Sequence, residues 1–196
     1  CYINLNLIRG CFKQNNMSKL GTLKLFSLCT VSLSALAISS IVYANPADGQ
    51  VTHGSAAIMQ KSPKKLEIVQ DTESAVIDWR SFDIAPDEHT NFVQPSASST
   101  TLNRVTGPTA SNVMGKLTAN GNIILVNPNG VFFGEDAIVD VNSIIATTAD
   151  IDNNDFMSGR LHFHHHDDAN PNAKIQNDGL ISAKDAGLVA LVAPNV

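Results

Sequence analysis

The sequence predicts an all-β protein built from short strands, and three observations lead to this prediction. Short apolar runs rich in Val, Ile and Phe recur along the chain. Turn signals such as Asn-Gly and Asp-Gly separate these runs. No long amphipathic helix is evident. The strands that we expect comprise residues 65–70, 74–79, 90–95, 122–127, 130–134, 137–142, 143–148, 173–177, 179–183 and 187–194.

Two architectures fit strands this short, because the connections leave no room for helical crossovers. One is a sandwich of hairpins, which Asn-Gly and Asp-Gly turns favour. The other is a solenoid of coils, with three short strands per coil and parallel stacking. The strands that begin at Asn122 and Ser143 start 21 residues apart, which is close to one coil. This spacing puts the solenoid slightly ahead of the sandwich.

The segment Asn127-Pro128-Asn129-Gly130 separates two of the expected strands. Asn suits the first position of a β-turn, where its side chain bonds to the backbone, and Pro presets φ at the second. Gly130 completes a type I pattern, while Asn129 also tolerates the positive φ of a type II turn. Pro128 cannot donate to a ladder, so we predict a corner between coil faces. Loss of Asn127 would remove one capping hydrogen bond, at a cost of about 0.5–1.5 kcal/mol.

The start of the chain has the pattern of an export signal. Residues 1–16 precede the first methionine, and we expect them to be translated upstream sequence. Residues 17–44 combine a short region containing two lysines, an apolar run at 25–41 and the small-residue site Val-Tyr-Ala, as in a secretory signal peptide. We expect the Sec translocase to export the chain and cleavage to fall between Ala44 and Asn45. A membrane anchor over residues 25–41 is the alternative.

Removal of residues 1–44 would change both the charge and the cysteine content. All three Cys and four of the thirteen basic residues lie there, so residues 45–196 have no Cys and a formal net charge of −9. This charge argues against nonspecific nucleic-acid binding, which needs a positive surface. The absence of Cys has two explanations: a long β core needs no disulfide, or the chain must cross a second membrane unfolded.

Six ordered blocks are spread over residues 77–194. They are "IDWRSFDI" (77–84), "NFVQPS" (91–96), "LNRVTG" (102–107), "GKLTANGNIILVNPNGVFFG" (115–134), "SIIATTADI" (143–151) and "IQNDGLISAKDAGLVALVAP" (175–194). Together they resemble the N-terminal secretion domain of two-partner-secretion exoproteins, also described as the haemagglutination activity domain. This family includes filamentous haemagglutinin-type adhesins.

The resemblance implies a right-handed parallel β-helix with an N-terminal β cap over residues 45–196. It also implies that this domain directs a large exoprotein to a dedicated outer-membrane β-barrel transporter, whose periplasmic domains recognise it. The protein would be secreted by, or displayed on, a Gram-negative bacterium, and C-terminal regions would bind ligands on host or neighbouring cells. Such exoproteins are far longer, so we expect the domain to be truncated at its C-terminal end.

The resemblance also singles out candidate site residues. For Asn127, Pro128, Asn129 and Gly130 we expect a turn that helps the coil to form, and direct contact with the transporter is the second, compatible interpretation. We expect Trp79 to lie in the cap or the core rather than to serve as a ligand platform. For Arg104 we expect local pairing, with an exposed role in recognition as the alternative.

A secreted β-helical polysaccharide-acting enzyme or carbohydrate-binding module is the alternative function. Catalysis would need clustered carboxylates or a base near Arg, whereas the acids look scattered, with no evident pairing, so we predict no enzyme and no cofactor. Residues 162–168 contain four His and two Asp, but neighbours in an extended loop point in different directions, so we expect a solvated excursion rather than a metal site. The scattered acids are Asp136, Asp140, Asp150, Asp152 and Asp155.

Overall fold

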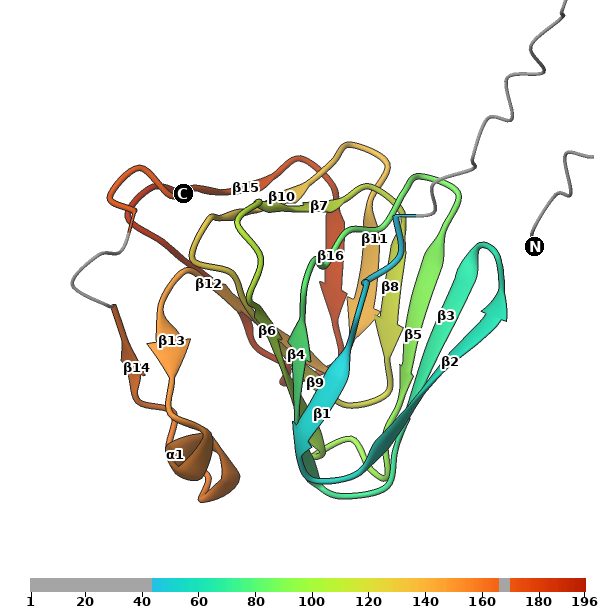
Figure 1. The fold of residues 1–196 in the computed structure, drawn as a ribbon. Coiled ribbons are helices and arrows are strands. Elements are labelled where there is room, and N and C mark those ends of the chain that lie inside the picture. Colours follow the sequence, from blue (N-terminus) through green and yellow to red (C-terminus); the bar gives the residue numbers. More distant parts are fainter. Residues whose placement is uncertain (1–43, 166–169) are drawn as a thin grey trace, which may run out of the picture. The chain divides into compact units, whose positions relative to one another are not determined.

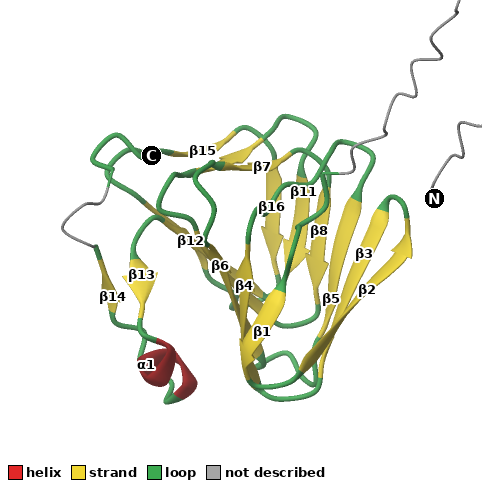
Figure 2. Ribbon diagram, in the orientation of Figure 1, coloured by secondary structure: helices red, strands yellow, loops and turns green. Residues whose placement is uncertain are grey.

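Coils of short strands stack on one another to form a parallel β-helix (Figure 1 and Figure 2). The computed structural model describes residues 44–165 and 170–196, so the predicted upstream segment and the signal peptide up to Tyr43 lie outside the described residues. Two long sheets and one short sheet form the walls of the helix. The solenoid is therefore confirmed, and the hairpin sandwich is excluded.

The two long sheets have the strand orders β1-β4-β6-β9-β12-β17 and β16-β11-β8-β5-β3-β2, and the short sheet has the order β15-β10-β7. Strand pairing within these three sheets is parallel, except between β1 and β4 and between β2 and β3. The right-handed sense that we predict is the one that crossovers between parallel strands take. The strands are β1 (Gln50–His53), β2 (Ala56–Ser62), β3 (Lys65–Gln70), β4 (Ser74–Trp79), β5 (His89–Val93), β6 (Thr100–Val105), β7 (Ser111–Val113), β8 (Lys116–Ala119), β9 (Asn122–Val126), β10 (Val131–Phe133), β11 (Ile138–Val141), β12 (Ser143–Thr147), β15 (Ile175–Asn177), β16 (Leu180–Ala183) and β17 (Val189–Val192).

The predicted coil length of 21 residues is confirmed by the register of β9 against β12. Asn122 lies opposite Ser143, and Ile123 lies opposite Ile144. Parallel stacking in register therefore places apolar side chains of one coil directly on those of the next. Both isoleucines are buried, and full burial of such a side chain is worth about 1.5–3 kcal/mol.

Strands β1, β2, β6, β7 and β8 lie outside the predicted strands because their sequences are short or interrupted by polar residues. Within a coil face only alternate side chains point inward. In β8, for example, Leu117 and Ala119 are buried, while Lys116 is exposed. Two inward residues are enough when the coils above and below supply the rest of the core, so these strands lack a long apolar run.

An antiparallel cap closes the N-terminal end of the helix. β1 pairs with β4, and β2 pairs with β3, both antiparallel. Val51, Ala56 and Ile58 from these strands pack against the core. The cap thus covers apolar side chains of the first coil that would otherwise face water, as terminal units of solenoids must.

Between β12 and β15 the chain leaves the helix in an excursion, residues 148–174. Its elements are β13 (Asp150–Ile151), α1 (Asn153–Met157) and β14 (Phe163–His164), which pairs antiparallel with β13. In the described part of the chain, no helix has the length and apolar character needed to cross a membrane.

The excursion covers an apolar column on the outer face of one long sheet. Val76, Leu102 and Ile124 are register partners on β4, β6 and β9, and all are buried. Ile151 and Phe156 of the excursion pack onto them, with half-buried Phe163 beside them. The prediction of a solvated excursion at 162–168 is therefore wrong for Phe163, while residues 166–168 lie outside the described residues.

Candidate functional site

The segment Asn127–Gly130 forms a β-turn at a corner of the helix, between β9 and β10. The Gly130 amide donates to the Asn127 carbonyl at 3.0 Å, and the Asn129 amide donates to Asn127 Oδ1 at 2.9 Å. Among the described residues, only Asp48 and Ala186 have a positive φ outside glycine. Asn129 therefore does not adopt the conformation of a type II turn, and this alternative is excluded.

Side-chain hydrogen bonds tie this turn to the corner of the preceding coil. Asn127 Nδ2 donates to the Thr109 carbonyl and to Ser111 Oγ, both at 3.0 Å. Asn129 Nδ2 donates to the Gly107 carbonyl at 3.0 Å. Asn127 is fully buried, and its side chain bonds to Thr109, Ser111 and the Asn129 amide. Its loss would therefore remove several bonds and leave the buried Ser111 hydroxyl without this partner, so our expectation of one lost capping bond is wrong.

The backbone of Gly130 meets the next coil at close range. Its φ is +108°, and an added Cβ would lie 2.4 Å from the Lys174 carbonyl oxygen. The Val131 amide donates to the same carbonyl at 3.0 Å. The corner therefore contacts the preceding coil on one side and Lys174 on the other. Within the corner, only Pro128 and Asn129 are partly exposed.

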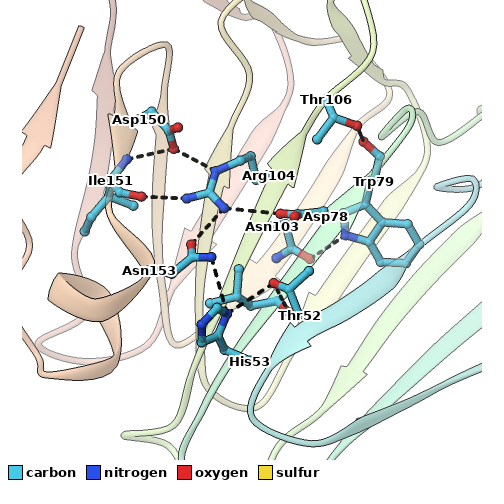
Figure 3. Close-up of polar contacts among 11 residues, drawn as sticks. Thr52, His53, Asp78, Trp79, Asn103, Arg104, Thr106, Asp150, Ile151 and Asn153 are labelled. Atoms are coloured by element: carbon cyan, nitrogen blue, oxygen red, sulfur yellow. Dashed lines mark hydrogen bonds and ion pairs between the residues drawn. The ribbon is translucent and has the colours of Figure 1, made fainter. Parts of the chain in front are cut away.

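Arg104 lies on β6 at the junction between the helix and the excursion (Figure 3). Its Nε donates to Asp150 at 2.7 Å, and its Nη1 lies 3.2 Å from Asp78. Further bonds reach Asn153 Oδ1 at 2.8 Å and the Ile151 carbonyl at 2.5 Å. With a side chain only 15% exposed, Arg104 clamps the excursion to the sheet and presents little surface to a partner.

A cleft of about 460 Å³ lies beside this clamp. His53 from β1 contacts Asn153 across it, at 3.3 Å between Nδ1 and Nδ2. Asp152 caps α1 by accepting the amides of Asn154 and Asp155, and these bonds hold its pKa below the ordinary value. The cleft is lined by His53, Arg104, Asp150, Ile151, Asp152, Asn153, Asn154 and His164.

Trp79 is buried at the end of β4, where the cap meets the first coil. Its indole Nε1 donates to Asn103 Oδ1 at 3.0 Å, and its ring packs edge-on against Phe82. A Cβ added to Gly49 in the cap would lie 2.4 Å from the indole ring. The structure thus places Trp79 in the core, in contact with the cap.

Several of the acids that seemed unpaired in the sequence do have basic partners. Asp150 pairs with Arg104, Asp140 with Lys184 at 2.9 Å, and Asp155 with Arg160 at 2.6 Å. The expectation of no pairing is wrong because strand register and the excursion bring distant residues together. Within residues 44–165 and 170–196, no group of three or more His, Cys, Asp or Glu side chains is placed to hold a metal ion.

The predicted processing residues lie at the edge of the folded unit. Asn45 is buried, and the Ala44 amide donates to Glu88 Oε1 at 2.9 Å. Sequence reasoning missed Glu88, and it also missed Asn103, the partner of Trp79. The alternation of β6, in which Leu102 and Arg104 point outward, would have placed Asn103 inside, but nothing local marks Glu88.

Known proteins with similar sequences show the family to which this fold belongs. Residues 43–196 match the family described as the TPS secretion domain, that is, two-partner secretion. Heme/hemopexin-binding proteins of Haemophilus influenzae are 38% and, in strain KW20 / Rd, 39% identical over 136 residues. These matches span 69% of this chain but only 14% and 15% of the relatives.

A solved structure shows the same architecture. The secretion domain of HMW1 from Haemophilus influenzae matches with a TM-score of 0.71 and 35% sequence identity, over 75% of this chain and 39% of that chain. The family match and the shared architecture define a β-helical secretion domain. This chain belongs to the TPS secretion domain family.

Proposed function

We propose that residues 45–196 are the N-terminal secretion domain of a large exported, adhesin- or haemagglutinin-like exoprotein. A dedicated outer-membrane β-barrel transporter recognises this domain through its own periplasmic domains. The family match over residues 43–196 carries the proposal. The chain spans about a seventh of the length of the curated relatives, so the activity of a whole exoprotein is part of the proposal.

The export route begins with the signal peptide. The Sec translocase moves the chain to the periplasm of a Gram-negative bacterium, and cleavage between Ala44 and Asn45 releases it. The chain then passes the outer membrane and is secreted or held at the cell surface. The apolar run at 25–41 and the Val-Tyr-Ala site support this step.

Recognition by the transporter uses the corner at 127–130. Buried Asn127 and Gly130 fix its shape, while Pro128 and Asn129 present the surface that a partner can touch. Trp79 and Arg104 act structurally, because both are occupied by contacts within the domain.

The domain itself performs no catalysis. Asp150, the acid nearest to Arg104, is held in the clamp, and Asp152 caps a helix. Regions outside this chain would bind the ligand of the exoprotein on host or neighbouring cells. The curated relatives are named heme/hemopexin-binding proteins, so heme or hemopexin is one candidate ligand for such regions.

Secretion with and without the cognate transporter tests the proposal. The chain is expressed with its own signal peptide, and the medium, periplasm and membranes are assayed separately. We expect release to the medium only when the transporter is present. N-terminal sequencing should give Asn45. Equal release from both strains, or retention of residues 25–41 in the product, would overturn the export route.

A further inference from the structure

Glu88 is a buried acid whose carboxylate faces the start of the described chain. It is 4% exposed. Oε2 accepts the amide of Ala85 at 2.9 Å, which closes its own turn, and Oε1 accepts the amide of Ala44 at 2.9 Å. The ion pairs among the described residues do not include Glu88. Burial of a carboxylate without a positive partner destabilises a folded protein. The bond that closes the turn therefore does not by itself explain why an acid is buried at position 88.

Removal of residues 1–44 changes the surroundings of this carboxylate. Oε1 loses the Ala44 amide, and Asn45 gains a positively charged α-amino group. Consecutive backbone nitrogens lie at most about 3.6 Å apart, and the Ala44 nitrogen lies 2.9 Å from Oε1, so the new group arises within about 6.5 Å of the carboxylate. Ala44 and Ala85, whose amides both donate to Glu88, also line a hollow of about 370 Å³.

The rest of Asn45 is already held in place. Its side chain is buried, and Oδ1 accepts the Thr90 hydroxyl at 3.3 Å. Burial of Asn45 and its bond to Thr90 thus anchor the terminus close to Glu88. While residue 44 is attached, the buried Nδ2 of Asn45 lacks a hydrogen-bond partner among the described residues.

We propose that Glu88 binds the α-amino group that processing creates at Asn45, so that removal of the signal peptide completes an ion pair inside the folded domain. The inference rests on the proposed cleavage site. The folded state of the processed chain gains an interaction that the precursor lacks. The domain is therefore less stable while the signal peptide is attached, which favours an unfolded chain early in export.

The test is a cycle of four samples of the processed protein. Wild type and Glu88→Gln are each compared before and after selective acetylation of the α-amino group, with mass spectrometry to establish the site. Gln keeps the hydrogen-bonding shape of the side chain but carries no charge. We expect acetylation to lower the melting temperature of the wild type by about 3 °C or more and to leave that of Glu88→Gln unchanged. Equal shifts in both backgrounds would overturn the proposal.

A neighbouring acid provides the matched control. Asp87 is exposed and pairs with Lys64, so Asp87→Asn should keep the full effect of acetylation. If it abolishes the effect, the coupling is a general response to charge and the proposal fails.

A second measurement covers the case in which Glu88→Gln does not fold. The α-amine of the wild type is methylated with a ¹³C label and titrated by NMR. Pairing with a carboxylate favours the charged form, so its pKa should lie above the ordinary value of about 7.7–8.0. An ordinary value would overturn the proposal.

These outcomes are separable from the fate of the proposed function. The stability cycle needs no transporter, so a protein that is secreted as proposed but shows no coupling defeats only the ion pair. A mature terminus other than Asn45 defeats both the cleavage site and the ion pair. Failure of transporter-dependent release, with coupling intact, defeats only the export proposal.

Discussion

Among single residues, Gly130 is the position of the corner at which the backbone has least freedom. We predict that Gly130→Val destabilises the domain by about 3 kcal/mol or more, because a side chain must adopt positive φ and also meets the Lys174 carbonyl. Gly159→Val is the matched control: Gly159 has φ +76°, but an added Cβ meets nothing within 4 Å. Urea unfolding of both variants separates the contact from the strain. Equal losses would show that contact with the next coil contributes nothing.

Pro128 offers a way to separate recognition from folding at the same corner. We predict that Asn127→Ala loses about 2–3 kcal/mol of stability, because Ser111 and the Thr109 carbonyl lose their partner. Pro128→Ala breaks no hydrogen bond and should cost less than about 1 kcal/mol. If the transporter reads this surface, Pro128→Ala should still weaken binding to the periplasmic domains by about fivefold or more.

Unfolding and binding titrations on the same samples decide between these roles. Pro95→Ala, which alters an exposed proline elsewhere, should leave binding unchanged. Wild-type binding by Pro128→Ala would restrict the corner to a structural role.

The sequence predicts the turn at 127–130 because its signals are local: Asn, Pro and Gly each favour one position of a β-turn. The burial of Asn127 could not be predicted in the same way. Its Nδ2 contacts lie 16 and 18 residues back, so they depend on which coils stack. The partners of Arg104 lie 26 to 49 residues away, and only the folded register brings them together.

Among the elements, the excursion is held to the sheet by apolar packing and by the polar contacts of Arg104. We predict that Arg104→Met destabilises the domain by about 3 kcal/mol, because Asp78 and Asp150 lose their positive partner in a largely enclosed site. The effect should be local. Hydrogen exchange should accelerate in β13 and α1 and change little in β9 and β12, whose core contacts remain.

Arg160→Met is the control for this clamp. Arg160 also bonds an acid of the excursion, Asp155, but its side chain is 53% exposed, and exposed pairs contribute little. Its loss should leave the exchange rates near those of the wild type. Uniform acceleration throughout the sheets after Arg104→Met would show that Arg104 supports the helix as a whole rather than the excursion.

Strands could be predicted from the sequence where the strand itself contains a continuous apolar run, as β9 and β12 do. Prediction failed for β7 and β8, which depend on the coils above and below for their core. Only residues 162–168 were predicted as an excursion, and nothing predicted α1, which buries Phe156 against the outer column of the sheet. That column was not evident, because Leu102 sits among polar residues in its own strand.

Across the whole domain, each coil rests mainly on its neighbours, so stability is spread along the stack rather than concentrated in one centre. Residues 45–196 contain no Cys, and the confirmed β core shows that coil stacking can hold the fold without disulfides. The second explanation, passage through the outer membrane as an unfolded chain, makes a different demand. It requires that nothing covalent hold the coils together during export.

An engineered disulfide tests this demand on the whole molecule. Ile138 and Leu180 are register partners on the adjacent parallel strands β11 and β16, and their side chains are 45% and 62% exposed. Neighbouring strands lie about 4.8 Å apart, within the span of a disulfide. We predict that the double variant Ile138→Cys/Leu180→Cys is retained in an oxidising periplasm, because the bridge closes a loop that cannot pass extended. Each single variant should be secreted normally, and a reductant should restore release of the double variant.

Fractionation of the cells, with non-reducing gels to detect the disulfide, measures the outcome. Normal secretion of a fully bridged protein would contradict export as an unfolded chain, and would mean that the transporter passes at least two joined coils together.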